Sequence, residues 1–431
     1  MEPLLEDFLR YVKIWTTSAE DVDETPTTQR QFDLAKILVE DLHALGLNDA
    51  AVDEHAYVYG HLPATKGLEK CPAPGFIAHL DTAEFCGENV KPRVIENYNG
   101  GAITLENGLR LTPEEFPHLP SLAGRTLIVT DGTTLLGADD KAGIAAIIEL
   151  LRRLRDKDIP HGAICVAFNP DEEVGAGTCY FDLTRFGATA AYTVDGGAEN
   201  DLNWECFNAA AARVSIAGKS IHPGSAKNKM VNANLVAMEF NALLPEAERP
   251  EKTEGYEGFY GLMHMAGTVD AATMDYILRD HDAEKFEQKK CRLQKIAETL
   301  NTRYGTGTVT VELRDQYRNM REALTGHEET VQLAVKAMES AQLTPDIQPI
   351  RGGTDGAALS YMGLPCPNIG AGGYNFHGPL EHITLEGMQK AAEVMENLVI
   401  AWTKEKTPRK ASLFRRVFGK QKGGKRSCMT N

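Results

Sequence analysis

Apolar runs that end in polar residues recur along the first half of the chain, with a long helical pattern between them. The runs at residues 73–82, 125–132, 162–170 and 189–197 predict short buried strands. Residues 140–157 predict a helix, because apolar side chains recur at helical spacing between an acidic start and basic last turns. Strands that alternate with helices predict an α/β fold with a mostly parallel sheet and helices on both of its faces.

The sequence pattern changes near residue 207 and changes back near residue 319. Between these points the order is strand, helix, strand, strand, helix, strand, which predicts an inserted ferredoxin-like α+β domain. With 431 residues the chain is also too long for one ordinary core. We therefore expect a larger α/β domain of residues 1–206 and 319–405, a smaller inserted domain of residues 207–318, and a basic, disordered tail of residues 406–431.

The formal net charge is −16, yet ten Lys/Arg and one Glu from Lys404 onward give +9, which leaves −25 for the rest. An acidic body argues against nucleic acid as a partner. No run approaches the roughly 18 apolar residues of a membrane span, and the N-terminus lacks the order of a secretion signal. None of the eight cysteines forms a CxxC pair, so we expect mostly reduced thiols. These observations together predict a cytoplasmic location and no stable membrane insertion.

Three carboxylates in a row, at residues 171–173, follow the apolar run that ends at Asn169. Like charges this close repel, so they must either point into water or surround a positive group. The other predicted strand ends also carry imidazoles or carboxylates: His79 and Asp81, Asp139 and Asp140, Asp195, and His377 with Glu381 and His382. Taken alone, each is more often a solvated turn or a satisfied core residue than a ligand. Their recurrence at five places favours a shared site.

Histidine nitrogen and carboxylate oxygen are ligands that suit Zn²⁺. No cysteine occurs at these positions, which favours a catalytic zinc site over a structural one. Two imidazoles and several carboxylates exceed the needs of one tetrahedral ion. Two zinc ions, about 3.5–4 Å apart and bridged by one carboxylate, would use them all and would offset the charge of the clustered acids.

Several of these stretches together resemble one family. FIAHLDT, LLGADDKAG, PDEEVG, TVDGG and GGYNFHG resemble motifs of the di-zinc exopeptidases of the aminoacylase and carboxypeptidase G type. TEGYEGFY, NMRE and RGGTDGA resemble, more narrowly, the tripeptide aminopeptidases within that family. The resemblance runs from near residue 1 to about residue 403, and the basic tail is the main departure from it.

The resemblance implies a role for each residue of the cluster. It implies that His79 and Asp195 bind the first zinc, that Asp139 bridges, and that Glu173 and His377 complete the second. It implies further that Glu172 is the general base for attack of a zinc-bound hydroxide on the peptide bond, and that Asp81 orients the His79 ring. Since metal-bound histidine usually donates its other N–H to a carboxylate, and residues 79 and 81 point to the same side of a strand, the Asp81 role is also physically reasonable.

Substrate groups and partners are implied less directly. His222 is expected to reach the oxyanion from the inserted domain, and Arg351, with Asn319 as a further candidate, to bind the substrate carboxylate or backbone. The resemblance also implies that residues 1–206 and 319–405 form the catalytic di-zinc domain and that the inserted residues 207–318 form a lid or dimerisation domain. A short peptide is then the expected substrate and a homodimer the expected assembly. The alternatives are a broader dipeptidase or N-acyl amino acid deacylase of the same family, or a metal-binding scaffold without catalysis. The presence of Glu172, the residue a catalytically dead relative would lose first, favours the enzyme.

Overall fold

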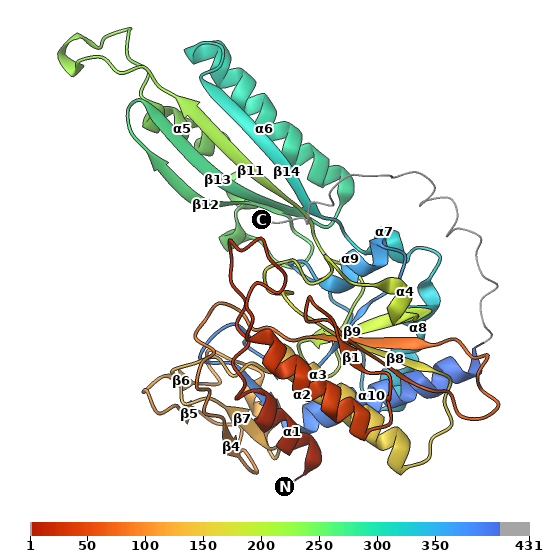
Figure 1. Ribbon diagram of the computed structural model, residues 1–431. Helices are drawn as coiled ribbons and strands as arrows, with labels where there is room; N and C mark the ends of the chain where they lie inside the picture. The colour runs from red at the N-terminus through yellow and green to blue at the C-terminus, as the bar shows by residue number, and fades with distance from the viewer. Residues whose placement is uncertain (1, 406–431) are drawn as a thin grey trace. The chain divides into compact units, whose positions relative to one another are not determined.

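Figure 1 shows the computed structural model, which describes residues 2–405. These residues form two compact units. Unit 1 consists of residues 2–204, 323–347 and 354–405, and unit 2 of residues 205–322 and 348–353. The predicted basic tail, residues 406–431, lies outside the described residues.

Unit 1 is built on a seven-stranded sheet with the order β1-β2-β8-β3-β9-β15-β10. The four central strands run parallel, and the outer strands pair antiparallel at both edges. The strands are β1 (Ala51–Val52), β2 (Val58–Leu62), β3 (Pro74–His79), β8 (Ile164–Asn169), β9 (Ala190–Gly196), β10 (Leu202–Asn203) and β15 (Asn368–Gly370). The predicted α/β class with a mostly parallel sheet is confirmed, because the strands that carry the apolar runs form the parallel centre.

Helices cover both faces of this sheet. The larger core joins α1, α2, α3, α8 and α10 to one face, and a smaller core joins α4 and α9 to the other. Alternate residues of β3 divide between the cores, since Phe76 points into the larger and Ile77 into the smaller. The helices are α1 (Pro3–Tyr11), α2 (Gln31–Ala44), α3 (Ala138–Asp156), α4 (Leu183–Phe186), α8 (Glu328–Ser340), α9 (Asp355–Tyr361) and α10 (Leu385–Lys404).

The apolar run at residues 125–132 belongs to a different sheet from the other three. It forms β7 in a four-stranded antiparallel sheet of order β16-β17-β7-β4. This layer has its own small core around Leu127 and Val129. Its strands, together with a hairpin and a 3₁₀ turn nearby, are β4 (Arg93–Ile95), β7 (Leu127–Val129), β16 (Gly373–Tyr374), β17 (His382–Thr384), β5 (Ile103–Thr104), β6 (Arg110–Leu111) and η1 (Leu119–Leu122).

Unit 2 has the predicted ferredoxin-like architecture. Its antiparallel sheet has the order β12-β13-β11-β14, and α5 and α6 contribute to the same core as the sheet. The elements are β11 (Asn208–Ala217), η2 (Pro223–Ser225), α5 (Ala233–Ala242), η3 (Glu246–Glu248), η4 (Pro250–Lys252), β12 (Phe259–Gly267), β13 (Ala271–Asp280), α6 (Ala283–Tyr304) and β14 (Val309–Tyr317); the short α7 (Arg321–Leu324) follows at the unit boundary.

The main segment of unit 2 runs over residues 205–322, against 207–318 for the predicted insertion, and unit 2 also includes residues 348–353. Ile350 N donates to Glu205 O, and the Arg351 guanidinium donates to backbone carbonyls of Thr253, Gly255 and Glu257. These contacts join residues that are far apart in the sequence and leave no local pattern. Periodicity could therefore not assign residues 348–353 to unit 2.

No helix in residues 2–405 combines the length and apolarity that a membrane crossing requires. The thiols of Cys71, Cys86, Cys165, Cys206, Cys291 and Cys366 are free. A cytoplasmic location stays a prediction.

Candidate metal centre

Asp139 lies between two histidines that come from distant parts of the chain. Its Oδ1 lies 2.8 Å from His79 Nε2, and its Oδ2 lies 2.9 Å from His377 Nε2. His79 ends β3 and is 2% exposed, whereas His377 lies in the loop between β16 and β17 and is 54% exposed. Each oxygen of one carboxylate therefore faces a different imidazole, which is how a ligand shared by two ions would be placed.

The backbone at the start of α3 turns Asp139 toward these histidines. Asp139 and Asp140 have non-helical backbone angles, so the regular helix begins after them. Asp140 Oδ1 accepts a hydrogen bond from Gly143 N (3.1 Å) and thereby caps the first regular turn. Asp140 Oδ2 accepts from His79 N (3.2 Å). Of the two adjacent acids, one thus fixes the helix start to β3 and the other is directed into the cluster.

Glu381 holds the chain just before Asp139. This buried carboxylate accepts hydrogen bonds from Leu136 N (2.7 Å) and Gly137 N (2.9 Å) with Oε2, and from Asp139 N (3.1 Å) with Oε1. Burial raises the pKa of Glu381 to about 7. The sequence marked Glu381 only as one acid among several; its role as a backbone acceptor has no sequence signal.

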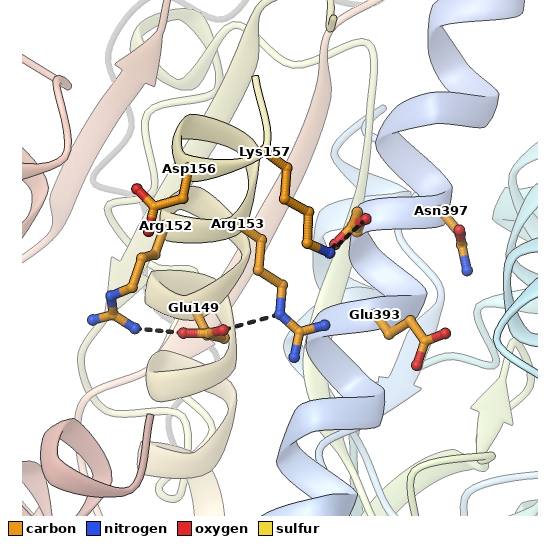
Figure 2. A pocket seen from close by; sticks show the side chains of 8 residues that line it. Glu149, Arg152, Arg153, Asp156, Lys157, Glu393 and Asn397 are labelled. Carbon is orange, nitrogen blue, oxygen red and sulfur yellow. Dashed lines mark hydrogen bonds and ion pairs between the residues drawn. The ribbon is translucent and has the colours of Figure 1, made fainter. Parts of the chain in front are cut away.

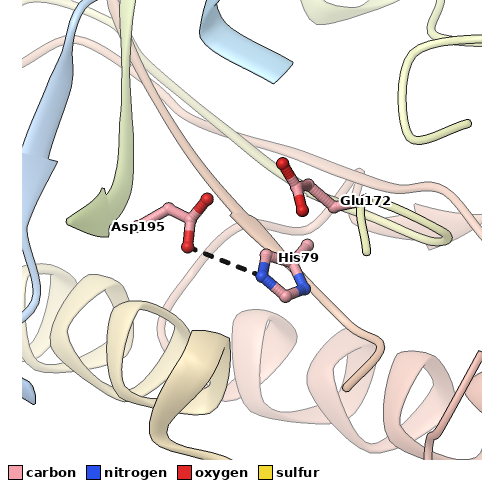
Figure 3. Close-up of side chains that lie close together, drawn as sticks. All are labelled: His79, Glu172 and Asp195. Carbon is pink, nitrogen blue, oxygen red and sulfur yellow. Dashed lines mark ion pairs between the residues drawn. The ribbon is translucent and has the colours of Figure 1, made fainter. Parts of the chain in front are cut away.

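Two groups of potential metal ligands share His79. His79, Glu172 and Asp195 place one ligand atom each within 4.8 Å of one another, and so do His79, Asp139 and Glu173. Figure 3 shows the first group, with the Asp195 carboxylate to the left of the His79 ring and the Glu172 carboxylate above it in this view. Asp195 Oδ1 lies 3.5 Å from His79 Nε2.

The three consecutive acids at residues 171–173 have three different sets of neighbours. Glu172 faces His79 in the first group, and Glu173 Oε2 lies 3.0 Å from His377 Nε2. Asp171 turns away from both histidines and accepts a hydrogen bond from Gln31 Nε2 (2.6 Å). The carboxylates diverge, which reduces the repulsion expected from their sequence adjacency. The structure brings all five predicted ligands into one cluster: His79, Asp139, Glu173, Asp195 and His377.

Asp81 supports this cluster from behind. Its Oδ1 lies 3.3 Å from His79 Nδ1, and its backbone carbonyl lies 3.0 Å from the same nitrogen. A proton on Nδ1 leaves the Nε2 lone pair free to bind a cation. The two Asp81 oxygens also accept from the backbone N–H groups of Glu172 (3.0 Å) and Glu173 (3.2 Å). Asp81 therefore orients the histidine and the turn that carries both glutamates.

The charges in the cluster shift one another's pKa values strongly. Burial opposes the charged form of His79, but the Asp195 and Asp139 carboxylates raise its pKa well above the usual value. Hydrogen bonds to Asp139 and Glu173 raise the pKa of His377 to about 10. Burial and the neighbouring Asp139 charge raise the pKa of Asp195 to about 7. The acids outnumber the imidazoles, so some carboxylates are not neutralised by the protein's own groups.

The donor set fits a pair of dications on two observations. Burial, together with the charges of Asp195 and Asp355, raises the pKa of Glu172 well above its usual value, and burial raises that of Glu173. Glu173 Oε1 is also buried and has no hydrogen-bond partner among the described residues. Cations close to these oxygens would stabilise their ionised forms and satisfy the unpaired atom.

A buried amide–acid pair lies next to Glu172 and was missed by the sequence analysis. Asn169 Nδ2 donates to Asp355 Oδ2 (2.6 Å), and both residues line a narrow pocket with Glu172 and Asp195. Burial raises the pKa of Asp355 to about 7. Asp355 begins α9, in the stretch TDGA, and nothing local distinguishes it from a helix-start acid.

The three predicted substrate-binding residues all belong to unit 2. His222 is exposed, and its Nδ1 accepts from Gly224 N (3.2 Å). Asn319 is buried; its amide accepts from Cys206 N (3.1 Å) and donates to His281 O (3.1 Å). The Arg351 guanidinium donates to the backbone of the loop at residues 253–257 and lies over the Phe207 ring. A substrate role for His222, Asn319 and Arg351 stays a prediction.

A second hollow in unit 1, a surface groove of about 500 Å³ between α3 and α10, has a different character (Figure 2). Its charged side chains are largely paired: Glu149 with Arg152 (2.5 Å) and Arg153 (2.9 Å), and Lys157 with Glu396 (2.8 Å). The two Glu149 pairs lie within α3, and the Lys157–Glu396 pair joins the end of α3 to α10. Ion pairs at the surface contribute little to stability. The described residues that line the groove include no histidine, cysteine, serine or threonine.

Comparison with known proteins places the chain in a family. Residues 131–401 match the model of peptidase family M20/M25/M40. The chain is 49% identical to peptidase T of Alkaliphilus oremlandii over 409 residues, which cover 94% of this chain and 100% of that one. It is 50% identical to peptidase T of Bacillus licheniformis over 400 residues, which cover 92% of this chain and 97% of that one.

Among solved structures, the aminopeptidase PepT of Bacillus cereus has a TM-score of 0.75 and 25% identity and covers 94% of this chain and 99% of its own. The YXEP protein of Bacillus subtilis, described as a dinuclear metal-binding peptidase from the M20 family, has a TM-score of 0.59 and 15% identity, with 92% and 97% covered. The chain therefore belongs to the M20/M25/M40 family of peptidases, within which its relatives are peptidase T enzymes, and it is a metallo-aminopeptidase.

Proposed function

We propose that this enzyme is a di-zinc aminopeptidase that releases the N-terminal residue from tripeptides. The observation that carries the proposal is the position of Asp139, whose two oxygens face His79 and His377 while Glu172 flanks the same cluster. The family and the peptidase T relatives support the activity, and the aminopeptidase PepT structure supports the fold that presents it.

The proposed ligands divide into two sets. His79 and Asp195 would hold one ion, Glu173 and His377 the other, and Asp139 would bind both. Nitrogen and oxygen donors without a cysteine favour Zn²⁺. The dinuclear description of the YXEP protein supports a pair of ions over a single one.

Bound at these positions, dications lower the pKa of water and polarise the peptide carbonyl. The protein's own contribution to proton transfer comes from Glu172. Its carboxylate faces the cluster and accepts no hydrogen bond from the described residues, so it is available to take a proton from the attacking water and return it to the leaving amine nitrogen. Asp81 keeps the proton of His79 on Nδ1 and fixes the backbone of Glu172.

Substrate length separates the proposed function from its family alternatives. We expect kcat/KM for the alanyl tripeptide to be at least about tenfold higher than for the alanyl di- and tetrapeptides. A tenfold preference corresponds to about 1.4 kcal/mol of differential transition-state binding. The measurement is kcat/KM on the three peptides and on an N-acetylated amino acid. Equal rates on all three peptides would indicate a broad peptidase, and hydrolysis of the N-acetylated compound alone would indicate a deacylase.

Unit 2 is the proposed site of homodimer formation. Its edge strand β12 exposes Met263 (65%) and Met265 (41%), and α5 exposes Leu235 (61%) and Met238 (61%). Exposed apolar side chains on an edge strand favour association with another chain. We expect the double variant Met263→Asp, Met265→Asp to sediment as a monomer while the unchanged protein sediments as a dimer. A monomeric unchanged protein at micromolar concentration would contradict the assignment.

A further inference from the structure

Asp171 is fully buried, although it is the first of three consecutive acids and lies next to the proposed base. Its Oδ1 accepts hydrogen bonds from Gln31 Nε2 (2.6 Å) and Thr27 Oγ1 (2.6 Å), and its Oδ2 accepts from Thr27 N (2.8 Å). Neither of these two partner residues belongs to the metal cluster. Gln31, which donates to Asp171, lies 140 residues earlier in the chain.

Gln31 contacts Asp171 at two points. Besides the bond from its Nε2 to the carboxylate, its Oε1 accepts from the backbone N–H of Asp171 (3.2 Å). Gln31 is itself 0% exposed and is the first residue of α2. One amide side chain therefore fixes both the backbone and the side chain of the residue that precedes Glu172 and Glu173. We call these two residues the Asp171–Gln31 pair.

The segment that precedes Gln31 also contacts Thr82, which lies next to Asp81 in the chain. Thr28 Oγ1 donates to Thr17 O (2.8 Å), and the hydroxyls of Thr17 and Thr82 lie 3.1 Å apart. Ser18 N donates to Thr82 O (3.2 Å). Thr82 follows Asp81, which orients His79 and accepts from the backbone of residues 172 and 173.

The backbone at Asp171 explains why such a clamp is needed. Its φ of 57° lies in the left-handed region, which non-glycine residues rarely adopt without support from their surroundings. A change at this angle would rotate the following peptide and redirect both glutamates. Asp81 holds residues 172 and 173 from one side, and the Asp171–Gln31 pair holds residue 171 from the other.

We propose that the Asp171–Gln31 pair is a positioning device for the reaction, through which the N-terminal segment of residues 17–31 sets the direction of Glu172 and Glu173. The inference rests on the proposed function, because it takes Glu172 as the base and Glu173 as a ligand. Asp171 and Gln31 act through these residues and touch neither substrate nor metal.

The test exchanges the donor and the acceptor of the pair. In Asp171→Asn alone, the new side-chain NH2 group must face another donor, either Gln31 Nε2 or Thr27 N. In Gln31→Glu alone, two carboxylates face each other. The double variant restores a complementary pair, since the carboxylate introduced at position 31 can accept from both the side-chain and the backbone N–H groups at position 171. The amide oxygen introduced at position 171 remains available to accept from Thr27 N. Matched controls on exposed residues outside this segment are Asp158→Asn and Gln294→Glu.

The zinc-loaded full chain of each variant is assayed for kcat and KM on the alanyl tripeptide. Zinc equivalents, thermal unfolding and hydrogen–deuterium exchange over residues 170–176 are measured on the same samples. Each single variant should lower kcat about 10- to 100-fold, as for other residues that support metal ligands, with KM within about twofold. Exchange over residues 170–176 should become faster, and the double variant should recover at least about tenfold of kcat and the slow exchange.

Single variants that are less stable but keep the wild-type kcat per folded molecule would show that the pair only anchors α2, and would overturn the inference. If both single variants fail to fold, the double variant decides: a folded, active protein supports the pair, and an unfolded or inactive one overturns it. Loss of activity in Glu172→Gln with unchanged kcat in these variants would remove this inference alone, whereas an active Glu172→Gln would remove the proposed function.

Discussion

Replacing Glu172 by glutamine is expected to lower kcat by at least about 10³-fold, in the upper range for loss of a general acid–base group. The substitution keeps the size of the side chain and removes its ability to accept and return a proton. The fold should be unaffected, because the Glu172 carboxylate accepts no hydrogen bond within residues 2–405. The residue is held through its backbone instead, since its N–H donates to Asp81 and its carbonyl accepts from Gly175 N.

Metal content separates the two roles that the geometry allows for Glu172. Its carboxylate lies within 4.8 Å of ligand atoms of His79 and Asp195, close enough for a base and also for a ligand. A base predicts that Glu172→Gln retains both zinc equivalents and loses turnover; a ligand predicts that one equivalent is lost as well. The measurements are elemental analysis and kcat on the same preparation, with the exposed Glu88→Gln as the matched control. Wild-type turnover in Glu172→Gln would exclude the proposed mechanism.

Much of the fold could be predicted because its signals are local. Continuous apolar runs predicted β3, β8 and β9, and helical periodicity predicted α3; each forms where expected. The order of elements in unit 2 likewise follows from alternation and spacing within short windows. The run that forms β7 has the same local character, yet it pairs with β4 and β17 in a separate antiparallel sheet. Which sheet a strand joins depends on distant partners, and periodicity does not report them.

The site shows the same division. Residue type identified the imidazoles and carboxylates that gather around Asp139, since few combinations of side chains bind dications. The supporting contacts could not be predicted: Glu381 accepts three backbone N–H groups, and Gln31 reaches Asp171 across 140 residues. The three acids in a row illustrate why. Their sequence left open whether they point into water or surround a positive group, and it assigned Glu172 and Glu173 different roles. The contacts of Asp171 with Thr27 and Gln31 carried no sequence signal.

Asp139→Ala and His377→Ala are expected to differ in the number of ions that they lose. Asp139 faces both histidines, so its removal takes a ligand from each proposed position, and we expect less than about half an equivalent of zinc and at least about a 10⁴-fold loss of kcat. His377 contacts Asp139 and Glu173, and we propose that it binds only one of the two ions. Its replacement by alanine should leave one equivalent bound by His79, Asp195 and Asp139.

This difference is measured as zinc equivalents after dialysis against metal-free buffer. Circular dichroism of the same samples checks that each variant is folded. His327→Ala is the matched control, since His327 is about as exposed as His377 (51% against 54%) and lies at the start of α8. A single centre would lose its ion equally in both site variants, and a bridging role for Asp139 would then be wrong. Retention of two equivalents in His377→Ala would instead show that the exposed histidine is not a ligand. A carboxylate that binds both ions predicts two zinc equivalents in the unchanged enzyme, one in His377→Ala and close to none in Asp139→Ala. No other pattern of zinc content agrees with it.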